Sequence, residues 1–361
     1  MPAYIHTIHT CLPGYSYDQL KIRDLLKELL GEEEKLKSLI HLIYSRSGIQ
    51  KRHSVLPEID LVFSNGEPAG TGDRNKLYRK EAGKLFIEAA KGVINSGAIE
   101  SAGSITHLVT ISCTGFYAPG QDFDLIRNFQ LSPDVERYHL GFMGCYAAIS
   151  GLRLAARICE SDPEACVLVI SGELCTLHFQ GGTSIDELIS GSVFADGAAA
   201  AIVSGSAPRQ GPALRLDGFT TFLANEGDKD MDWTIGDTGF DMVLSSRIPD
   251  LISDNLQDLF KLLQKRLGVD QNRVDKWAVH PGGRAILDKL QKELNLDKSR
   301  LEVSRSVLAE YGNMSSATIL FVLKRIMEQS ASGQQAEQVL SMAFGPGLTV
   351  ETALMSLIES N

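Results

Sequence analysis

The stretch that decides the fold is HLGFMGCYAAISGLRLA, residues 139–155. Cys145 ends a turn that contains glycine, and a run of small and apolar residues follows it up to Arg153. This run predicts a helix over residues 145–160 that is apolar on nearly every face and is therefore buried. A helix N-terminus carries partial positive charge and free N–H groups, so a thiolate there is stabilised and its pKa falls. Cys145 is thus either an activated nucleophile or a small core residue, the usual fate of a free cysteine.

The composition is that of a soluble globular protein. Of 361 residues, 43% are hydrophobic and 22% are charged, and the net charge is −10. This acidic balance argues against nucleic acid or an anionic membrane as the main partner. The chain contains no uninterrupted apolar stretch of the roughly 18 residues that a membrane span needs, and its first twenty residues lack the signal-peptide pattern. The six cysteines show no zinc-ligand spacing, which predicts free thiols, no metal and a cytoplasmic location.

Short apolar runs alternate with amphipathic stretches, which predicts an α/β fold. The first half contains predicted strands at residues 4–9, 105–115, 164–173 and 196–205, predicted helices at 16–30, 32–43, 80–96 and 145–160, and a polar surface loop at 64–76. The second half contains predicted helices at 249–267 and 315–330, a strand running into a loop at 276–283, and a hairpin-like pair of strands over 339–355.

The two halves repeat one plan. A stretch rich in Pro, Gly and Ser at residues 204–215 predicts a boundary, which gives an N-terminal half over 1–205 and a C-terminal half over 206–361. In the first half a strand-to-loop junction at Cys113 precedes Cys145 by 32 residues. In the second half the junction at His280 precedes Asn313 by 33 residues. If the halves pack about a pseudo-two-fold axis, these four positions converge.

His280 and Asn313 each allow a structural and a functional reading. His280 ends a strand before Pro-Gly-Gly, where it is either a hydrogen-bonded structural residue or a functional loop residue whose glycine neighbours let a ligand approach. Asn313 suits a helix N-cap, and its amide can also point at an oxyanion. Together with a thiolate that accepts an acyl group, these two donors suit acyl-thioester chemistry, including stabilisation of the enolate formed when a malonyl group loses CO₂.

The sequence also carries a family resemblance. GFMGCYAAISGLRLA, FADGAAAAIVSG, WAVHPGGRAIL, YGNMSSATILFVL and FGPGLTVETALM, spread in order over nearly the whole chain, resemble the motifs of type III polyketide synthases, the chalcone synthase-like enzymes. The resemblance implies a thiolase fold, a duplicated five-layer αβαβα architecture, usually assembled as a homodimer. It implies coenzyme A thioesters as substrates, malonyl-CoA with or without an acyl-CoA starter, and no further cofactor.

By the same resemblance, Cys145 is the acyl-carrying nucleophile and forms an ion pair with His280, while His280 and Asn313 promote decarboxylation. Phe194 matches the gatekeeper phenylalanine between the CoA tunnel and the cavity. The histidine motif HPGG differs from the HQAN motif of ketoacyl synthases of type III, which makes such an enzyme the weaker alternative. A non-catalytic acyl-CoA-binding member of the fold would normally have lost one of the three residues.

Departures from the plant pattern concern the cavity. Cys113, Cys175 and His178 stand where chalcone-type members have small threonines, Met242 replaces a second gatekeeper phenylalanine, and Trp233 falls near a glycine. The two cysteines and the bulky aromatic resemble the bacterial tetrahydroxynaphthalene synthases, which start from malonyl-CoA. A flexible Met242 could instead let a long acyl chain pass, as in alkylpyrone and alkylresorcinol synthases. We favour malonyl priming and a small product of tetrahydroxynaphthalene or phloroglucinol type.

CoA phosphates need cations, and two segments offer candidate CoA-binding residues. The first segment is SRSGIQKRH, which is either a phosphate site at the tunnel mouth or an ordinary charged surface loop. The candidates from both segments are Arg46, Lys51, Arg52, Gly283, Arg284 and the backbone N–H of Ala285.

Overall fold

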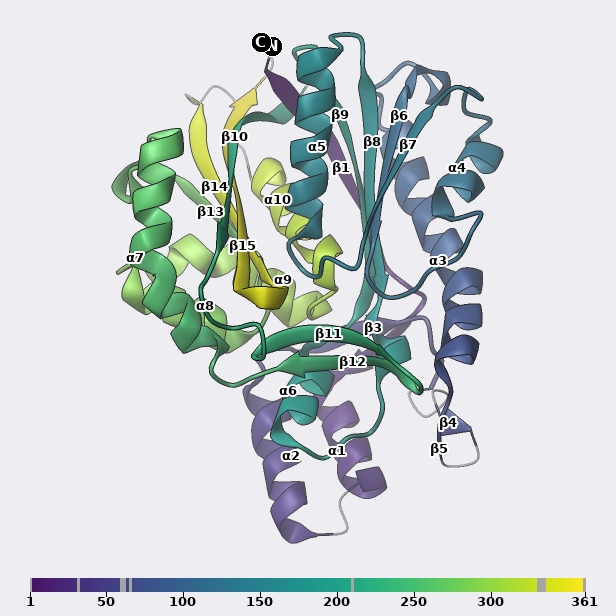
Figure 1. The fold of residues 1–361 in the computed structure, drawn as a ribbon, viewed down its shortest axis with the longest axis vertical. Coiled ribbons are helices and arrows are strands. Elements are labelled where there is room, and N and C mark those ends of the chain that lie inside the picture. The colour runs from purple at the N-terminus through teal and green to yellow at the C-terminus, as the bar shows by residue number, and fades with distance from the viewer. Residues whose placement is uncertain are drawn as a thin grey trace.

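The computed structural model describes residues 2–30, 33–58, 63–64, 67–208, 211–329 and 336–359. Within these ranges nine strands form one mixed sheet that runs through both halves of the chain (Figure 1). In their spatial order they are β13 (Lys276–Val279), β14 (Glu337–Gly345), β15 (Thr349–Glu359), β10 (Pro212–Leu223), β1 (Ala3–Cys11), β9 (Asp196–Ser204), β8 (Cys166–Leu174), β6 (His107–Ser112) and β7 (Glu136–Gly141).

Helices cover both faces of this sheet and fill the space between its halves. They are α1 (Gln19–Leu30), α2 (Glu34–Arg46), α3 (Thr71–Ile94), α4 (Gln121–Phe129), α5 (Ala147–Ser161), α6 (Ile185–Val193), α7 (Ile248–Leu267), α8 (Arg284–Glu293), α9 (Glu302–Tyr311) and α10 (Thr318–Glu328). Two-stranded ribbons are formed by β2 (Tyr15–Asp18) with β3 (Lys51–Ser54), β4 (Phe63–Ser64) with β5 (Glu67–Pro68), and β11 (Met231–Gly236) with β12 (Gly239–Leu244). None of the helices in the described ranges is long and apolar enough to cross a membrane.

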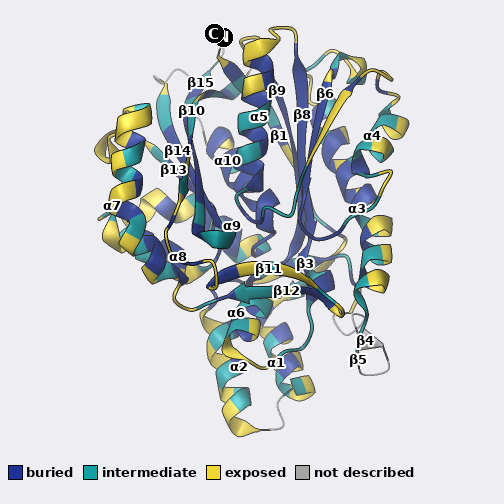
Figure 2. Cartoon of the chain, in the orientation of Figure 1, coloured by how far each residue is buried: buried dark blue, intermediate teal, exposed yellow. Residues whose placement is uncertain are grey.

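The layers follow from strand alternation, since successive side chains point to opposite faces of a sheet. In β8, Val167 and Val169 face the core cluster that contains α5 and α10, while Leu168 and Ile170 face the cluster that contains α3 and α4. In the other half, Ala278 faces α5 and α10, whereas its neighbours in β13 face α7 and α8. The order helix, sheet, helix, sheet, helix confirms the predicted αβαβα architecture, and Figure 2 shows its buried interior.

The two halves meet in two ways. The α5 and α10 helices pack side by side between the sheet halves and contribute most of one apolar cluster (Figure 1). A short antiparallel contact then links the halves, because Ala3–Ile5 of β1 pair with residues 214–216 of β10. The 204–215 segment that we predicted as a boundary is the connection from β9 to β10, apart from residues 209–210, which lie outside the described residues.

Several predicted boundaries were wrong. The 64–76 segment, predicted as a polar surface loop, contains the start of α3 at Thr71. Most side chains in the first two turns of this helix are polar, although Arg74 and Tyr78 are buried. The predicted helix over 16–30 begins only at Gln19, after β2, and the Asp18 carboxylate accepts hydrogen bonds from the N–H groups of Leu20 and Lys21. The predicted helix over 315–330 begins with a 3₁₀ turn before α10. Residues 31–32, 65–66 and 330 of these predicted segments lie outside the described residues.

We expect Leu152→Ala in α5 to destabilise the protein by about 2–5 kcal/mol, because Leu152 is fully buried between the sheet halves and its removal leaves a cavity. Chemical denaturation monitored by circular dichroism measures the change. The matched control is Leu29→Ala in α1, where the side chain is 51% exposed and the change should be small. Equal effects of the two substitutions would contradict the central position assigned to α5.

Candidate active site

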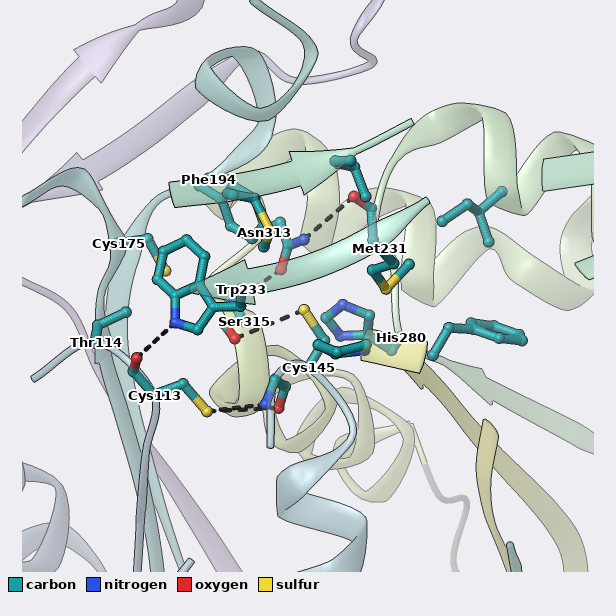
Figure 3. Close-up of a pocket in the computed structure, with 17 residues that line it drawn as sticks. Cys113, Thr114, Cys145, Cys175, Phe194, Met231, Trp233, His280, Asn313 and Ser315 are labelled. Atoms are coloured by element: carbon teal, nitrogen blue, oxygen red, sulfur yellow. Dashed lines mark hydrogen bonds between the residues drawn. The ribbon is translucent and has the colours of Figure 1, made fainter. Parts of the chain in front are cut away.

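Cys145, His280 and Asn313 line one pocket at the end of the central layer (Figure 3). Cys145 lies two residues before α5, His280 follows β13, and Asn313 lies between α9 and the 3₁₀ turn Ser315–Ala317. The structure thus brings together the three residues predicted from motif spacing, and each of them is at least 92% buried. The other lining residues are Cys113, Thr114, Gly144, Cys175, Phe194, Met231, Trp233, Met242, Leu244, Gly282, Ile286, Ser315, Phe344 and Pro346.

The turn before Cys145 has an unusual backbone. Phe142 and Gly144 both have positive φ values, 59° and 78°. A Cβ atom on Gly144 would lie 2.4 Å from Cδ of Pro346, so only glycine fits. The Gly144 N–H donates a hydrogen bond of 3.0 Å to Sγ of Cys113. The turn is therefore held from both halves of the chain, and it fixes where the Cys145 thiol lies.

The electrostatics of Cys145 differ from the prediction. Burial raises the pKa of the thiol to about 11, and the hydroxyl of Ser315, 3.7 Å from Sγ, offsets this only in part. Burial thus shifts the pKa in the direction opposite to the depression that we predicted from a helix terminus, because the thiol is enclosed by mostly apolar side chains. In this structure the resting side chain is a neutral thiol.

His280 is a buried imidazole with both ring nitrogens free of hydrogen-bond partners among the described residues. Burial lowers its pKa to about 3, so the ring is neutral at physiological pH. Its backbone N–H donates to Met342, which fixes the strand-end position. The ion pair with Cys145 that the family resemblance implied stays a prediction, since burial acts against the charged form of both side chains. A neutral imidazole with a free acceptor nitrogen can instead take the thiol proton during a reaction.

The orientation of the Asn313 amide follows from its contacts. Its Oδ1 accepts a hydrogen bond of 2.9 Å from the N–H of Ser315, which identifies Nδ2 as the group directed toward the pocket. Nδ2 donates to the carbonyl of Gly282 at 3.2 Å, and a hydrogen bond from the Asn313 side chain also acts to lower the pKa of the Cys145 thiol, against the larger effect of burial. Asn313 is not the N-cap of a helix, the structural role that the sequence also allowed, because α10 begins only at Thr318.

One site residue was missed in the sequence. Glu173 in β8 is fully buried behind the pocket, and burial raises the pKa of its carboxyl group. It accepts hydrogen bonds from the hydroxyl of Thr114 at 2.8 Å, from the N–H of Cys113 at 2.9 Å, and from the hydroxyls of Ser112 and Ser316. Glu173 thereby joins the Cys113 loop to the segment that carries Asn313. The available signal was a carboxylate at the end of an otherwise apolar strand.

The predicted cavity residues divide between two adjacent pockets. Cys113, Cys175, Phe194, Trp233 and Met242 line the pocket of Cys145, while His178 lines a second pocket. The two pockets share four of these residues, namely Cys175, Phe194, Trp233 and Met242. The side chains shared by both pockets therefore form the wall between them.

Aromatic rings stiffen this wall. The Trp233 indole N–H donates to the carbonyl of Cys113 at 2.8 Å. His178 stacks on Phe240 with ring centroids 4.1 Å apart, and it meets Trp233 edge-on at 5.6 Å. The Nε2 atom of His178 lies 2.7 Å from the Thr114 carbonyl, and Nδ1 accepts from the N–H of Phe240. Both nitrogens of His178 are thus occupied, in contrast to those of His280.

The predicted CoA ligands lie in two places. Arg46, Lys51 and Arg284 are exposed, and the Arg284 side chain packs against Gly48 in the loop that follows Arg46. Gly283 and Ala285 lie at the N-terminus of α8, where free N–H groups suit a phosphate. Their contacts with CoA stay a prediction.

The prediction for Arg52 was wrong. Its side chain is 4% exposed and lines the second pocket; Nε and Nη1 are hydrogen bonded to Gln19, Gly191 and Phe194, while Nη2 has no hydrogen-bond partner among the described residues. Such a guanidinium is not available to a solvent-exposed phosphate. No cluster of His, Cys, Asp and Glu within the described ranges is suited to hold a metal ion.

We expect Gly144→Ala to destabilise the protein and to slow alkylation of Cys145 by iodoacetamide, because the new methyl group collides with Pro346 and moves the thiol. Mass spectrometry of the Cys145 peptide and a thermal melt measure the two effects. Gly268→Ala is the matched control, since Gly268 also has a positive φ, 66°, but has open space around it. If both substitutions act alike, backbone strain alone, about 1–3 kcal/mol, accounts for the loss.

We expect His280→Ala to slow alkylation of Cys145 at pH 7 by about 100-fold, because the variant lacks the imidazole that takes the thiol proton. In the variant the rate should still be rising at pH 9, since burial raises the pKa of the thiol to about 11. Timed alkylation between pH 6.5 and 9.5 measures both profiles, with His41→Ala on the exposed face of α2 as the control. Equal rates at pH 7 in the wild type and His280→Ala would refute a base role for His280.

Comparisons with known proteins cover nearly the whole chain. The family model described as chalcone and stilbene synthases, N-terminal domain, matches residues 2–208, and the corresponding C-terminal domain model matches residues 217–359. Polyketide synthase PKS-I from the brown alga Ectocarpus siliculosus is 28% identical, with a TM-score of 0.90 over 99% of this chain and 98% of that chain. The C-terminal type III polyketide synthase domain of Steely1, a type I/III hybrid from Dictyostelium, is 26% identical, with a TM-score of 0.88 over 99% of each chain. The chain therefore belongs to the chalcone and stilbene synthase family of type III polyketide synthases.

Proposed function

We propose that this chain extends an acyl group held on Cys145 by repeated decarboxylative condensation with malonyl-CoA and then cyclises the product. The observation that supports this most strongly is the convergence of Cys145, His280 and Asn313 in one buried, mostly apolar pocket. A thiol, a free imidazole and an oriented amide are the groups that acyl transfer from a thioester requires.

Loading begins with proton transfer from the Cys145 thiol to the neutral His280 imidazole. The thiolate attacks the carbonyl carbon of a CoA thioester, a thioester forms on Sγ, and the C–S bond to CoA breaks. The CoA sulfur leaves as a thiolate and takes the proton from the His280 imidazolium. Cys145 and His280 are neutral before and after loading. The pocket therefore holds a thiolate and an imidazolium only during this step, when the two charges stabilise each other.

Extension uses the two hydrogen-bond donors. A malonyl thioester carbonyl accepts from the ring N–H of His280 and from Nδ2 of Asn313, and loss of CO₂ leaves an enolate on that oxygen. The enolate carbon attacks the Cys145 thioester and a C–C bond forms. The Cys145 thiolate is the leaving group, and the chain, now two carbons longer, is held on CoA. The lengthened thioester then reacylates Cys145. The buried surroundings strengthen each hydrogen bond to the developing charge.

We propose malonyl-CoA as the starter as well as the extender, and a small polyhydroxylated aromatic of tetrahydroxynaphthalene or phloroglucinol type as the product. Trp233 supports this, because its side chain narrows the pocket of Cys145 and His178 meets it edge-on from the second pocket. The space around the catalytic residues amounts to about 580 Å³, open mouth included.

The alternative is priming by an acyl-CoA that gives alkylpyrones or alkylresorcinols. It is favoured by the second pocket, about 970 Å³ with its open mouth, which adjoins the first at the flexible side chain of Met242. A chain on Cys145 that passed Met242 would enter this space. The choice between the starters therefore depends on whether Trp233 and Met242 move apart.

We further propose a cytoplasmic homodimer that needs no cofactor beyond CoA thioesters. The outermost strand of the N-terminal half, β7, has exposed side chains at residues 136–139 and no partner on its outer side among the described strands. An unpaired edge of this kind supports pairing with a second copy. The division into halves at residue 205 also stays a proposal, as does CoA binding by Arg46, Lys51, Gly283, Arg284 and Ala285.

The experiment that tests the function is mass spectrometry of products from the purified protein with malonyl-CoA alone, then with added acyl-CoA starters of increasing length. Aromatic products from malonyl-CoA alone would support malonyl priming. Products that require an acyl-CoA and retain its chain would establish the alternative. Release of no CoA in any mixture would refute catalysis and indicate an acyl-CoA-binding protein.

We expect Asn313→Ala to slow CO₂ release from malonyl-CoA by about 100- to 1,000-fold, as removal of one oxyanion donor does elsewhere, while Cys145 can still be acylated. Radiolabelled malonyl-CoA measures CO₂ release, and intact-protein mass spectrometry measures the acyl-enzyme. Cys145→Ala should abolish the acyl-enzyme and all chain extension. Unchanged CO₂ release in Asn313→Ala would remove Asn313 from the mechanism.

A further inference from the structure

Arg52 in β3 holds a buried positive charge that the mechanism above does not use. Its side chain is 96% buried, since 4% is exposed, and no carboxylate within the described ranges forms an ion pair with it. The guanidinium lies 5.9 Å from the centre of the Tyr44 ring. An unpaired buried charge is costly, so the contacts that it does make must compensate.

Those contacts are the backbone carbonyls at the C-terminal end of α6. Nη1 of Arg52 donates to the carbonyls of Gly191 at 2.8 Å and Phe194 at 2.7 Å. Nε donates to Oε1 of Gln19, whose own amide donates to the carbonyl of Ser192 at 2.8 Å. A helix leaves its last carbonyls without partners, and its C-terminus carries partial negative charge. Nε and Nη1 of the guanidinium therefore bind this helix end, while Nη2 has no hydrogen-bond partner among the described residues.

The remaining carbonyl at this helix end is hydrogen bonded to Asn313. The carbonyl of Val193 accepts the Asn313 N–H at 2.8 Å, and the Ala195 N–H donates to the Asn313 carbonyl at 2.8 Å. Arg52 also touches this segment from the other side, because a Cβ atom on Gly312 would lie 3.0 Å from Cγ of Arg52. One buried side chain therefore borders both the gatekeeper Phe194 and the residue before Asn313.

We propose that Arg52 is a positioning residue, which fixes the end of α6 and thereby the Phe194 gate and the Asn313 amide donor. The inference rests on the proposed function for the roles of Phe194 and Asn313 and for its readout, CO₂ release from malonyl-CoA. It replaces the predicted role of Arg52 as a CoA phosphate ligand. The two roles differ in their kinetics, because a phosphate contact acts on substrate binding and a misplaced oxyanion donor acts on the chemical step.

The test compares Arg52→Met with two other arginine variants in steady-state kinetics on malonyl-CoA. Arg52→Met should lower kcat for CO₂ release roughly 10- to 100-fold, with KM for malonyl-CoA changed less than about 3-fold. Arg46→Met, at the exposed C-terminal end of α2, serves as the reference for a phosphate contact and should raise KM instead. Arg157→Met removes an exposed arginine of α5 that pairs with Glu160 and should change neither constant.

Rates are expressed per Cys145 that iodoacetamide labels, so that a loss of folded protein does not register as a loss of kcat. If Arg52→Met does not fold, Gln19→Met takes its place. It removes the contact with Ser192 and the partner of Nε, and it should lower kcat by a smaller factor in the same direction.

A folded Arg52→Met with wild-type kcat, or one in which only KM rises, would overturn the proposal. If Arg52→Met does not fold, a wild-type kcat in Gln19→Met would also overturn the proposal. Inactivity of the wild type and of Arg157→Met would instead refute the proposed function, so the two failures are distinguishable.

Discussion

Two backbone hydrogen bonds between residues 193–195 and Asn313 tie the halves of the chain together at the active site. The apolar layer of α5 and α10 supplies the greater part of the attraction between the halves, but burial of apolar surface is non-directional. The two hydrogen bonds are directional, and they set the register between the end of α6 and the segment after α9. Phe194 and Asn313 lie within this pair of bonds, so the residues that we propose as gate and oxyanion donor share one fixed frame.

The neutral state of Cys145 shows which of two opposing effects dominates. A rise of the thiol pKa from its ordinary 9.0 to about 11 corresponds to about 3 kcal/mol against the thiolate, at 1.36 kcal/mol per unit. A charge at a helix terminus gains about 1 kcal/mol at most exposed sites, and the gain falls off within the first turn. Cys145 precedes that turn, so burial dominates. The proposed function therefore assigns activation of the thiol to the neighbouring His280 imidazole.

The parts of the fold and of the site that could be predicted are those whose signal can be read in the sequence itself. Apolar runs located strands of the main sheet, because this signal is local. The matched spacing of Cys113 with Cys145 and of His280 with Asn313 compares the two halves of the chain, and all four residues line one pocket. The start of α3 was missed, since its mostly polar first turns show no apolar periodicity. The contacts of Arg52 were also out of reach, because residues 19 and 191–194 meet it only in the folded chain. Burial, which decides the pKa of Cys145, is likewise a property of the whole fold.

The two buried histidines of the cavity, His178 and His280, differ in whether their ring nitrogens have hydrogen-bond partners. Burial lowers the pKa of both, to about 4 for His178 and about 3 for His280, so both rings are neutral. The nitrogens of His178 are held by the Thr114 carbonyl and the Phe240 N–H, which fixes one tautomer and makes the ring part of the wall. The nitrogens of His280 have no such partners in the described structure. A buried polar atom without a partner is costly, and a substrate carbonyl or the Cys145 proton can meet that need at His280. The same residue type thus shapes the cavity at one position and is left available for proton transfer at the other.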